Sequence, residues 1–241
     1  MALLSLTDVT KRYGALVVTD GISLEVAEGE IVGILGPNGA GKTTLFNLIA
    51  GTVRPDAGKV TFQGDDVTRL GVSERCRRGI SRSFQIPHPF SGMTVFENLL
   101  VGATFGRLDQ ATPAERRAAS VLAITGLSAK ANTLAGSLTL LERKRLEMAR
   151  ALSTDPRLLL LDEIAGGLTD HECQSLLATI RDVHASGVTI VWIEHVVHAL
   201  LSVAQRLVVV NFGKKIADGR PTEVLANADV QSVYMGDDAH V

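Results

Sequence analysis

The chain has few cysteines, few aromatic residues and almost no net charge. Only two of its 241 residues are cysteines, Cys76 and Cys173, and they have neither the paired spacing of a zinc site nor the density of a disulfide framework. Aromatic residues make up 4% of the chain and hydrophobic residues 46%, so we expect a largely aliphatic core. A formal net charge of −2 leaves no electrostatic footprint for nucleic acid, and no nucleic-acid partner is expected.

Long apolar segments are also missing. Residues 1–6 have neither the basic segment nor the long apolar stretch of a secretory signal. The apolar run at residues 158–161 is far too short to span a bilayer. Attachment to a membrane is therefore expected to come through a partner, and the two isolated thiols fit a reducing cytosol.

Basic residues gather in two short clusters, at residues 75–78 and 143–145. Both clusters lie beside helical patterning. Their position beside helical patterning indicates that the clusters form a solvated face or a surface that pairs with another subunit, and not a site for a polyanion.

The strongest motif is a glycine-rich segment between an apolar run at residues 31–35 and a helical pattern at residues 45–50. Its pattern, G-x4-G-K-T in a strand–loop–helix context, predicts a triphosphate-binding loop. Glycines allow the positive φ angles that turn amides inward, and the start of the helix attracts an anion. Lys42 would reach the β- and γ-phosphates of ATP, and Thr43 would offer a hydroxyl to Mg²⁺. The residues expected to contact nucleotide here are Gly36, Pro37, Asn38, Gly39, Ala40, Gly41, Lys42, Thr43 and Thr44.

A second segment indicates hydrolysis rather than binding alone. Residues 158–161 are four leucines without polar alternation, as in a strand covered on both faces, and Asp162 and Glu163 follow directly. In a phosphate-loop enzyme, Asp162 would hold the Mg²⁺ shell and Glu163 would polarise the attacking water. The alternative is a strand that simply ends in two solvated carboxylates. The presence of the phosphate loop argues against this alternative.

Four further features follow one another along the chain in the order of a known family. Tyr13 precedes the loop, Gln85 ends the segment 81–85, residues 138–142 precede a basic helical pattern, and His195 follows the apolar run 189–193. In order and spacing they resemble the ATP-binding subunits of ABC transporters. The resemblance implies that Tyr13 stacks on adenine, that Gln85 contacts Mg²⁺ and the membrane partner, and that His195 lies near the γ-phosphate.

The same resemblance identifies residues 138–142 as the signature motif, whose Thr139 and Leu141 would contact the nucleotide of a partner subunit. Many members of the family have two glycines where this chain has Leu140 and Leu141. A backbone amide is present whatever the side chain, so Leu141 can still donate if its dihedral angles permit, whereas a positive φ would strain this bulky residue.

Two further departures follow the acid pair. Ile164 replaces a usual proline, and Thr169 replaces a usual Asp or Asn. Thr169 also opens a capping box with Glu172, which gives it a structural explanation.

The narrowest resemblance is to the subfamily that powers bacterial uptake of branched-chain and other hydrophobic amino acids. It rests on residues 80–85, 93–102, 193–195, 219–225 and 233–236. It implies an ATPase with ATP and Mg²⁺, separate transmembrane permease subunits, a second ATPase subunit that is identical or different, and indirectly a periplasmic or extracellular substrate-binding protein. The expected location is peripheral, on the cytoplasmic face of the bacterial plasma membrane. The alternatives are an amide or urea importer, a lipid exporter, and a non-hydrolysing nucleotide-gated module, against which the intact Lys42, Glu163 and His195 argue.

The change in periodicity along the chain predicts one α/β phosphate-loop NTPase domain over residues 1–241. It would contain a mostly parallel core sheet, an antiparallel β layer from residues 3–9, 22–26 and 59–62, and an inserted helical subdomain. Residues 1–85 and 154–241 would form the nucleotide-binding core, and residues 86–153 the helical subdomain. Within the latter, a capping box from Thr112 to Glu115 and a terminator at Gly126 are expected to bound one helix.

Overall fold

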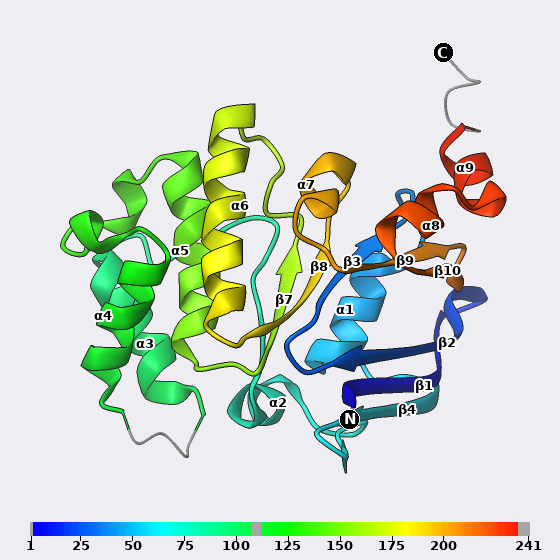
Figure 1. Ribbon diagram of the computed structural model, residues 1–241. Coiled ribbons are helices and arrows are strands. Elements are labelled where there is room, and N and C mark those ends of the chain that lie inside the picture. The colour runs from blue at the N-terminus through cyan, green and yellow to red at the C-terminus, as the bar shows by residue number, and fades with distance from the viewer. Residues whose placement is uncertain (1, 108–111, 236–241) are drawn as a thin grey trace. The chain divides into compact units, whose positions relative to one another are not determined.

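The computed structural model describes residues 2–107 and 112–235, whose helices and strands are labelled in Figure 1. The chain forms two compact units, the first from Met1–Val72 with Val191–Val241 and the second from Ser73–Ile190. The predicted subdivision, in which residues 86–153 form the helical part, has different boundaries and stays a prediction. None of the helices in the described part of the chain has the length and apolarity that crossing a bilayer requires.

The first unit contains the predicted antiparallel β layer. Its strands are β1 (Ala2–Tyr13), β2 (Leu16–Ala27), β4 (Ala57–Phe62) and β5 (Asp65–Asp66), in the order β2-β1-β4-β5. Leu4 pairs with Val26 on one side and with Phe62 on the other. These three side chains are buried, as one face of an alternating strand requires. The three strands predicted here are confirmed, and β1 and β2 are longer than expected.

The first unit also contains the strands that carry the phosphate loop. Strand β3 (Ile31–Leu35) pairs in parallel with β9 (Arg206–Asn211), and β9 pairs antiparallel with β10 (Lys214–Gly219). Helix α1 (Lys42–Ala50) lies between the two sheets of this unit (Figure 1), which explains why its apolar residues are buried. The unit is completed by α7 (Val197–Leu201), α8 (Pro221–Leu225) and α9 (Ala228–Met235). Gly236, the last residue of the expected 233–236 motif, lies outside the described residues.

The second unit pairs two short parallel strands and is otherwise mainly helical. Its strands are β6 (Ile80–Arg82) and β7 (Leu158–Asp162), and its helices are α2 (Val72–Arg78, whose first residue belongs to the first unit), α3 (Val95–Phe105), α4 (Ala114–Ile124), α5 (Leu140–Ser153) and α6 (Asp170–Ala185), with 3₁₀ turns at Ser128–Lys130 and Ala135–Ser137. Helix α3 packs against α4 and α5, and α5 packs against α6 (Figure 1). Helices α3, α4 and α5 lie within residues 86–153, the part of the chain that was expected to be helical.

Strand β8 (Thr189–Ile193) is buried throughout and coincides with the apolar run that precedes His195. The described strands include two parallel pairs, an antiparallel edge strand and a separate antiparallel sheet, and helices alternate with them. This arrangement confirms the predicted α/β fold class.

One predicted helix start is wrong. Helix α4 begins at Ala114 with Pro113 as its N-cap, and no side chain caps it. Pro113 itself is extended, with ψ 145°, so Thr112 lies one residue too early to bond the third residue of the helix. The predicted end is confirmed, because Gly126 has a φ of +68° just after the C-cap Thr125.

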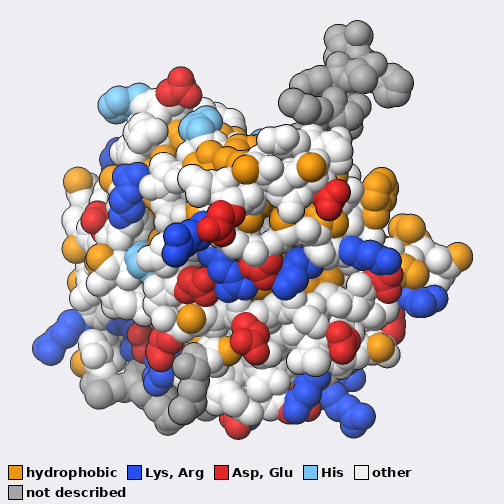
Figure 2. All heavy atoms as spheres, turned by 45° about the vertical axis from the view of Figure 1, so that its right-hand side comes forward, with side chains coloured by type: hydrophobic (Ala, Val, Ile, Leu, Met, Phe, Trp, Pro, Cys, Tyr) orange, Lys and Arg blue, Asp and Glu red, His pale blue; other side chains and the backbone are white. Residues whose placement is uncertain are grey.

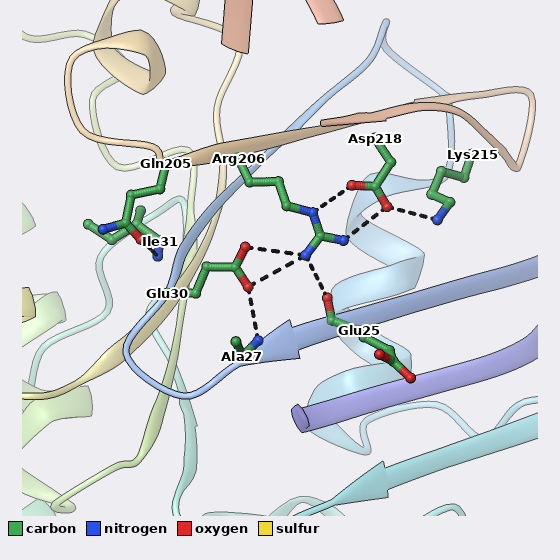
Figure 3. A network of polar contacts seen from close by, with 8 residues as sticks. All are labelled: Glu25, Ala27, Glu30, Ile31, Gln205, Arg206, Lys215 and Asp218. Carbon is green, nitrogen blue, oxygen red and sulfur yellow. Dashed lines mark hydrogen bonds and ion pairs between the residues drawn. The ribbon is translucent and has the colours of Figure 1, made fainter. Parts of the chain in front are cut away.

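Arg206 joins the two sheets of the first unit through a polar network (Figure 3). Its guanidinium donates to the Glu25 carbonyl at 2.9 Å and to a Glu30 carboxylate oxygen at 3.2 Å. It also donates to both carboxylate oxygens of Asp218, which in turn accepts from Lys215. The space-filling view shows basic and acidic side chains interspersed on one face of the molecule (Figure 2).

This network predicts an acid-sensitive contribution to stability. Burial raises the pKa of Asp218, but hydrogen bonds from Arg206 and Lys215 outweigh it, so the pKa lies below its ordinary value. Folding therefore favours the carboxylate. Its contribution is complete above the unfolded-state pKa of about 3.9 and is lost as the pH falls through the folded-state pKa. Asp218→Asn is expected to lower the free energy of unfolding by about 1–3 kcal/mol at pH 7 and by less at pH 3, measured by urea titration.

Asp20→Asn is the matched control, because Asp20 is half exposed and pairs with Lys214 at 3.4 Å. Exposed pairs contribute about 0–1 kcal/mol. An equal loss for Asp218→Asn at both pH values would contradict the assignment to the ionised carboxylate.

Candidate nucleotide site

The phosphate loop follows β3, and its glycines have the predicted backbone conformation. Gly36, Gly39 and Gly41 have φ angles of 153°, 79° and 102°, all in the region that favours glycine. A Cβ at Gly36 would lie 2.1 Å from the Val210 carbonyl oxygen, and one at Gly41 would lie 2.4 Å from that of Val18. Glycine is therefore required at Gly36 and Gly41 both for the turn and for the close approach of neighbouring backbone.

Lys42 is turned into this loop. Its Nζ donates to the carbonyl oxygens of Gly36 at 2.6 Å and Pro37 at 2.9 Å, and the residue is only 6% exposed. Thr43 is exposed and Thr44 is partly buried in the first turn of α1, where the amides cannot be satisfied within the helix. The loop and the first turn of α1 thus bring an ammonium group and backbone amides into the same segment, an arrangement that suits the phosphates of a nucleotide.

Two more predicted site residues lie in the first unit. Tyr13 ends β1 and is 48% exposed, and the Lys11 Nζ lies 5.6 Å from the centroid of its ring. His195 follows β8, and its side chain is 55% exposed. The backbone N–H of His195 donates to Oε1 of the fully buried Glu194 at 3.1 Å, and its Nδ1 lies 3.4 Å from the same oxygen. Glu194 thereby holds the histidine at the end of the strand.

The acid pair lies at the end of β7 in the second unit, as predicted. All residues of β7 are buried, including Asp162. Arg82, at the end of the neighbouring strand β6, donates to Oδ2 of Asp162 at 2.5 Å, and both side chains are under 10% exposed. The arginine supplies the charge partner that a buried carboxylate needs.

Glu163 and Gln85 meet directly. The Gln85 Nε2 donates to the Glu163 Oε2 at 2.5 Å. Glu163 has a φ of +45°, which is uncommon for a residue with a side chain and is typical of constrained functional positions. Two residues 78 positions apart, predicted separately from the sequence, therefore form one cluster.

The signature segment opens α5. Thr139 is the N-cap, and its side chain and that of Glu142 bond each other's backbone amides in a capping box. Leu140 and Leu141 are helical, and neither has a positive φ. The strain considered for Leu141 is therefore absent, and its amide lies in the first turn, where an outside acceptor can bind. The capping box predicted from Thr169 to Glu172 is confirmed at the start of α6.

Two polar residues at the site were missed by sequence reasoning. Arg82 pairs with Asp162, and a charged residue in a short apolar strand was the available signal. Lys144 is 5% exposed, and its Nζ donates to the carbonyl oxygens of Gln85 at 2.9 Å and Glu163 at 3.3 Å.

The basic cluster at residues 143–145 was interpreted as a solvated face or a surface that pairs with another subunit. Because Lys144 is buried, this interpretation is wrong for Lys144. The same interpretation of the cluster at residues 75–78 is wrong for Arg75, which is completely buried. A local run of positive charge cannot reveal which of its members faces inward.

The predicted residues divide between the units. Tyr13, residues 36–44 and His195 belong to the first, whereas Gln85, Thr139, Leu141, Asp162 and Glu163 belong to the second. Within the described ranges, no group of three or more His, Cys, Asp or Glu side chains could hold a metal ion.

Comparison with known proteins supports the nucleotide-site reading. The family model described as "ABC transporter" matches residues 19–166, and the model "Branched-chain amino acid ATP-binding cassette transporter" matches residues 214–240. The BraF protein of Pseudomonas aeruginosa, a high-affinity branched-chain amino acid transport ATP-binding protein, is 37% identical over 98% of both chains. LivG of Salmonella typhimurium, with the same description, is 38% identical over 98% of both chains.

A relative with another described role is equally similar. LptB of Acidithiobacillus ferridurans, a lipopolysaccharide export system ATP-binding protein, is 38% identical over 98% of this chain and 97% of the relative. Among solved structures, the ADP conformation of an ATP-binding cassette from an ABC transporter superposes with a TM-score of 0.89 at 32% identity, covering 98% of this chain and 99% of that one. A family model spanning more than half of the residues and relatives aligned over nearly the full length establish that the chain belongs to the ATP-binding cassette family of ABC transporters and is an ATPase of that family.

Proposed function

We propose that this protein is the ATP-hydrolysing subunit of a bacterial ABC importer for branched-chain or other hydrophobic amino acids. The observation that carries the substrate class is the match of residues 214–240 to the branched-chain amino acid cassette model, alongside the full-length similarity to BraF and LivG. The LptB relatives make a lipid exporter the second candidate. Importers of amides or urea are related alternatives within the same architecture.

Nucleotide binding is assigned to the first unit. The exposed ring of Tyr13 offers a face for adenine, and the amides of residues 36–44 and the Lys42 ammonium would surround the phosphates. On binding, the Lys42 ammonium would exchange its two carbonyl acceptors for phosphate oxygens. Because Lys42 is already buried without nucleotide, little further desolvation of its charge is needed. That exchange makes a buried lysine suitable for this role.

Hydrolysis is assigned to the acid at the end of β7. Glu163 would accept a proton from water as the water oxygen bonds to the γ-phosphorus and the bond to the β–γ bridging oxygen breaks, which leaves ADP and phosphate. Gln85 orients the Glu163 carboxylate through their 2.5 Å hydrogen bond. His195 would contact the γ-phosphate, with Glu194 holding its ring.

Each of the side chains predicted to hold Mg²⁺ carries an oxygen donor of the type that this ion prefers. Thr43 offers a hydroxyl oxygen, Gln85 keeps its amide oxygen while its Nε2 bonds Glu163, and Asp162 keeps Oδ1 while Oδ2 pairs with Arg82. Hard oxygen donors with few carboxylates are the set that Mg²⁺ prefers beside phosphates. Bound there, the ion would neutralise charge on the β- and γ-phosphates.

A second ATPase subunit would complete the site. In this arrangement Thr139 and the amide of Leu141 contact the γ-phosphate held by the partner, so one chain alone is expected to hydrolyse ATP slowly. The helical geometry of Leu141 supports this role despite its bulky side chain.

The membrane partner is expected to dock beside Gln85. Phe84, Ile86 and Phe90 are 52%, 65% and 45% exposed, so apolar surface is available there. Through permease subunits docked at this surface, the protein would lie on the cytoplasmic face of the membrane and be served indirectly by a substrate-binding protein.

The substrate class is tested with the intact transporter. The chain is purified from membranes with its associated subunits, reconstituted in liposomes, and assayed for ATP hydrolysis with its binding protein and leucine. We expect leucine-loaded binding protein to raise turnover several-fold and to drive leucine uptake. Stimulation by lipopolysaccharide in place of leucine would support the exporter instead.

A further inference from the structure

Helix α5 presents a line of charged side chains that the proposed mechanism does not use. Lys144, Glu147 and Arg150 follow one another at intervals of three residues, so they lie on one side of the helix. Lys144 and Glu147 are 5% and 4% exposed, and the Arg150 side chain is 24% exposed. Charged groups are buried to this degree only when they have partners.

The partners of this line are in residues 84–90, which we call the glutamine loop. Lys144 donates to the Gln85 carbonyl at 2.9 Å, and Arg150 donates to the His88 carbonyl at 2.8 Å and to Glu147 at 3.2 Å. Glu147 accepts backbone hydrogen bonds from His88 and Phe84. The Arg150 guanidinium also lies 4.8 Å from the centre of the Phe90 ring. The loop is therefore held to α5 along its whole length, mostly through its backbone.

Lys144 makes one contact that the other two residues do not. Besides Gln85, its Nζ reaches the Glu163 carbonyl at 3.3 Å. The side chains of Gln85 and Glu163 meet at 2.5 Å, so the ammonium joins the backbones of the two residues whose side chains form the candidate catalytic contact. Glu163 has a left-handed backbone, and a bond to its carbonyl restrains the peptide plane that directs its carboxylate.

From this geometry we propose that Lys144 is a positioning residue for ATP hydrolysis. Its hydrogen bonds fix the backbones of Gln85 and Glu163 relative to α5. The same helix begins at the signature residues Leu140 and Leu141, so a shift of α5 would be passed directly to both catalytic residues. Engagement of the signature with one nucleotide would thereby adjust the geometry around the other. This inference rests on the proposed function, because it takes Glu163 as the base.

The first test separates positioning from binding. In the purified ATPase at a concentration that supports dimers, Lys144→Met removes the ammonium but keeps the length of the side chain. We expect kcat to fall about tenfold and the affinity for ATP to stay unchanged. This loss of rate is smaller than the roughly 10²-fold loss that a misplacement of 1 Å can cause. Lys144→Arg, which keeps donors at this position, should recover most of the rate. Arg116→Met, which removes a cation from an exposed site on α4, is the matched control and should leave both parameters unchanged.

The second test asks whether Lys144 acts through Glu163. In a Glu163→Gln background, Lys144→Met should lower the residual rate by less than twofold, because the group that it positions is no longer a base. Amide hydrogen exchange should become faster in residues 84–90 of Lys144→Met, and this readout needs no hydrolysis. An additive tenfold loss in the double variant, or unchanged exchange in the loop, would overturn the proposal.

Each failure has a distinct meaning. If Glu163→Gln alone does not slow hydrolysis, the proposed role of Glu163 is wrong. If it does slow hydrolysis but Lys144→Met behaves like Arg116→Met, only the positioning role is wrong. Should Lys144→Met fail to fold, Lys144→Leu replaces it in both tests, because leucine also carries neither a charge nor a hydrogen-bond donor.

Discussion

Glu163→Gln is expected to slow ATP hydrolysis by roughly 10²–10⁴-fold while leaving ATP binding intact, which is the usual reach of a general base. Glutamine has the shape of glutamate and can still accept the hydrogen bond from Gln85, but it cannot take a proton from water. The phosphate loop lies in another part of the chain, at residues 36–44, and should bind ATP as before. Phosphate release at saturating ATP measures the rate, and calorimetric titration measures the affinity.

The matched control is Glu115→Gln on α4, where the glutamate is exposed. It makes the same chemical change away from the acid pair and should keep wild-type turnover. Equal turnover in Glu163→Gln and the wild type would remove Glu163 from its role. A loss of ATP affinity in the same variant would show instead that the substitution disturbs the fold of the site.

Lys42→Ala is expected to weaken ATP binding by about 10- to 100-fold. Hydrogen bonds to charged groups contribute about 1.5–3 kcal/mol, and each 1.4 kcal/mol corresponds to a factor of ten in affinity. In the structure the ammonium already lies between the Gly36 and Pro37 carbonyl oxygens, at 2.6 and 2.9 Å, so it is positioned for the phosphates before they arrive. The measurement is the rise in melting temperature on adding ATP, which should largely disappear in the variant.

Lys42→Ala also removes two internal hydrogen bonds, so the variant's melting temperature without nucleotide must be compared with the wild type. Lys59→Ala is the control, because the Lys59 side chain is half exposed and its Nζ lies 3.6 Å from Oδ2 of Asp66. It should respond to ATP as the wild type does. Undiminished affinity in Lys42→Ala would contradict the assignment of residues 36–44 as the phosphate loop.

Local patterns were sufficient for much of this protein. Strand β3, the glycine loop and α1 were predictable because positive φ angles, apolar runs and helix starts depend on residues close together in the sequence. The same holds for β7 with its acid pair, for β8 and for the capping box at Thr169. The start of α4 was wrong for an equally local reason, since Pro113 is itself extended and delays the helix by one residue. Recognition of Gln85, the signature and His195 needed the family resemblance, because single polar residues carry no local signal.

By itself, the sequence determined the fold class, the phosphate loop and the acid pair, because each depends on residue types at short spacing, and it determined the family through the order of these motifs along the chain. Only the tertiary structure decided that Arg82 pairs with Asp162, 80 positions away, and that Lys144 bonds carbonyl groups 59 and 19 positions away. It also decided that Arg206 joins Glu25 to Asp218. Whether a charged side chain faces solvent or a buried partner depends on which distant segments fold against it, and neither its identity nor its neighbours in sequence specify that.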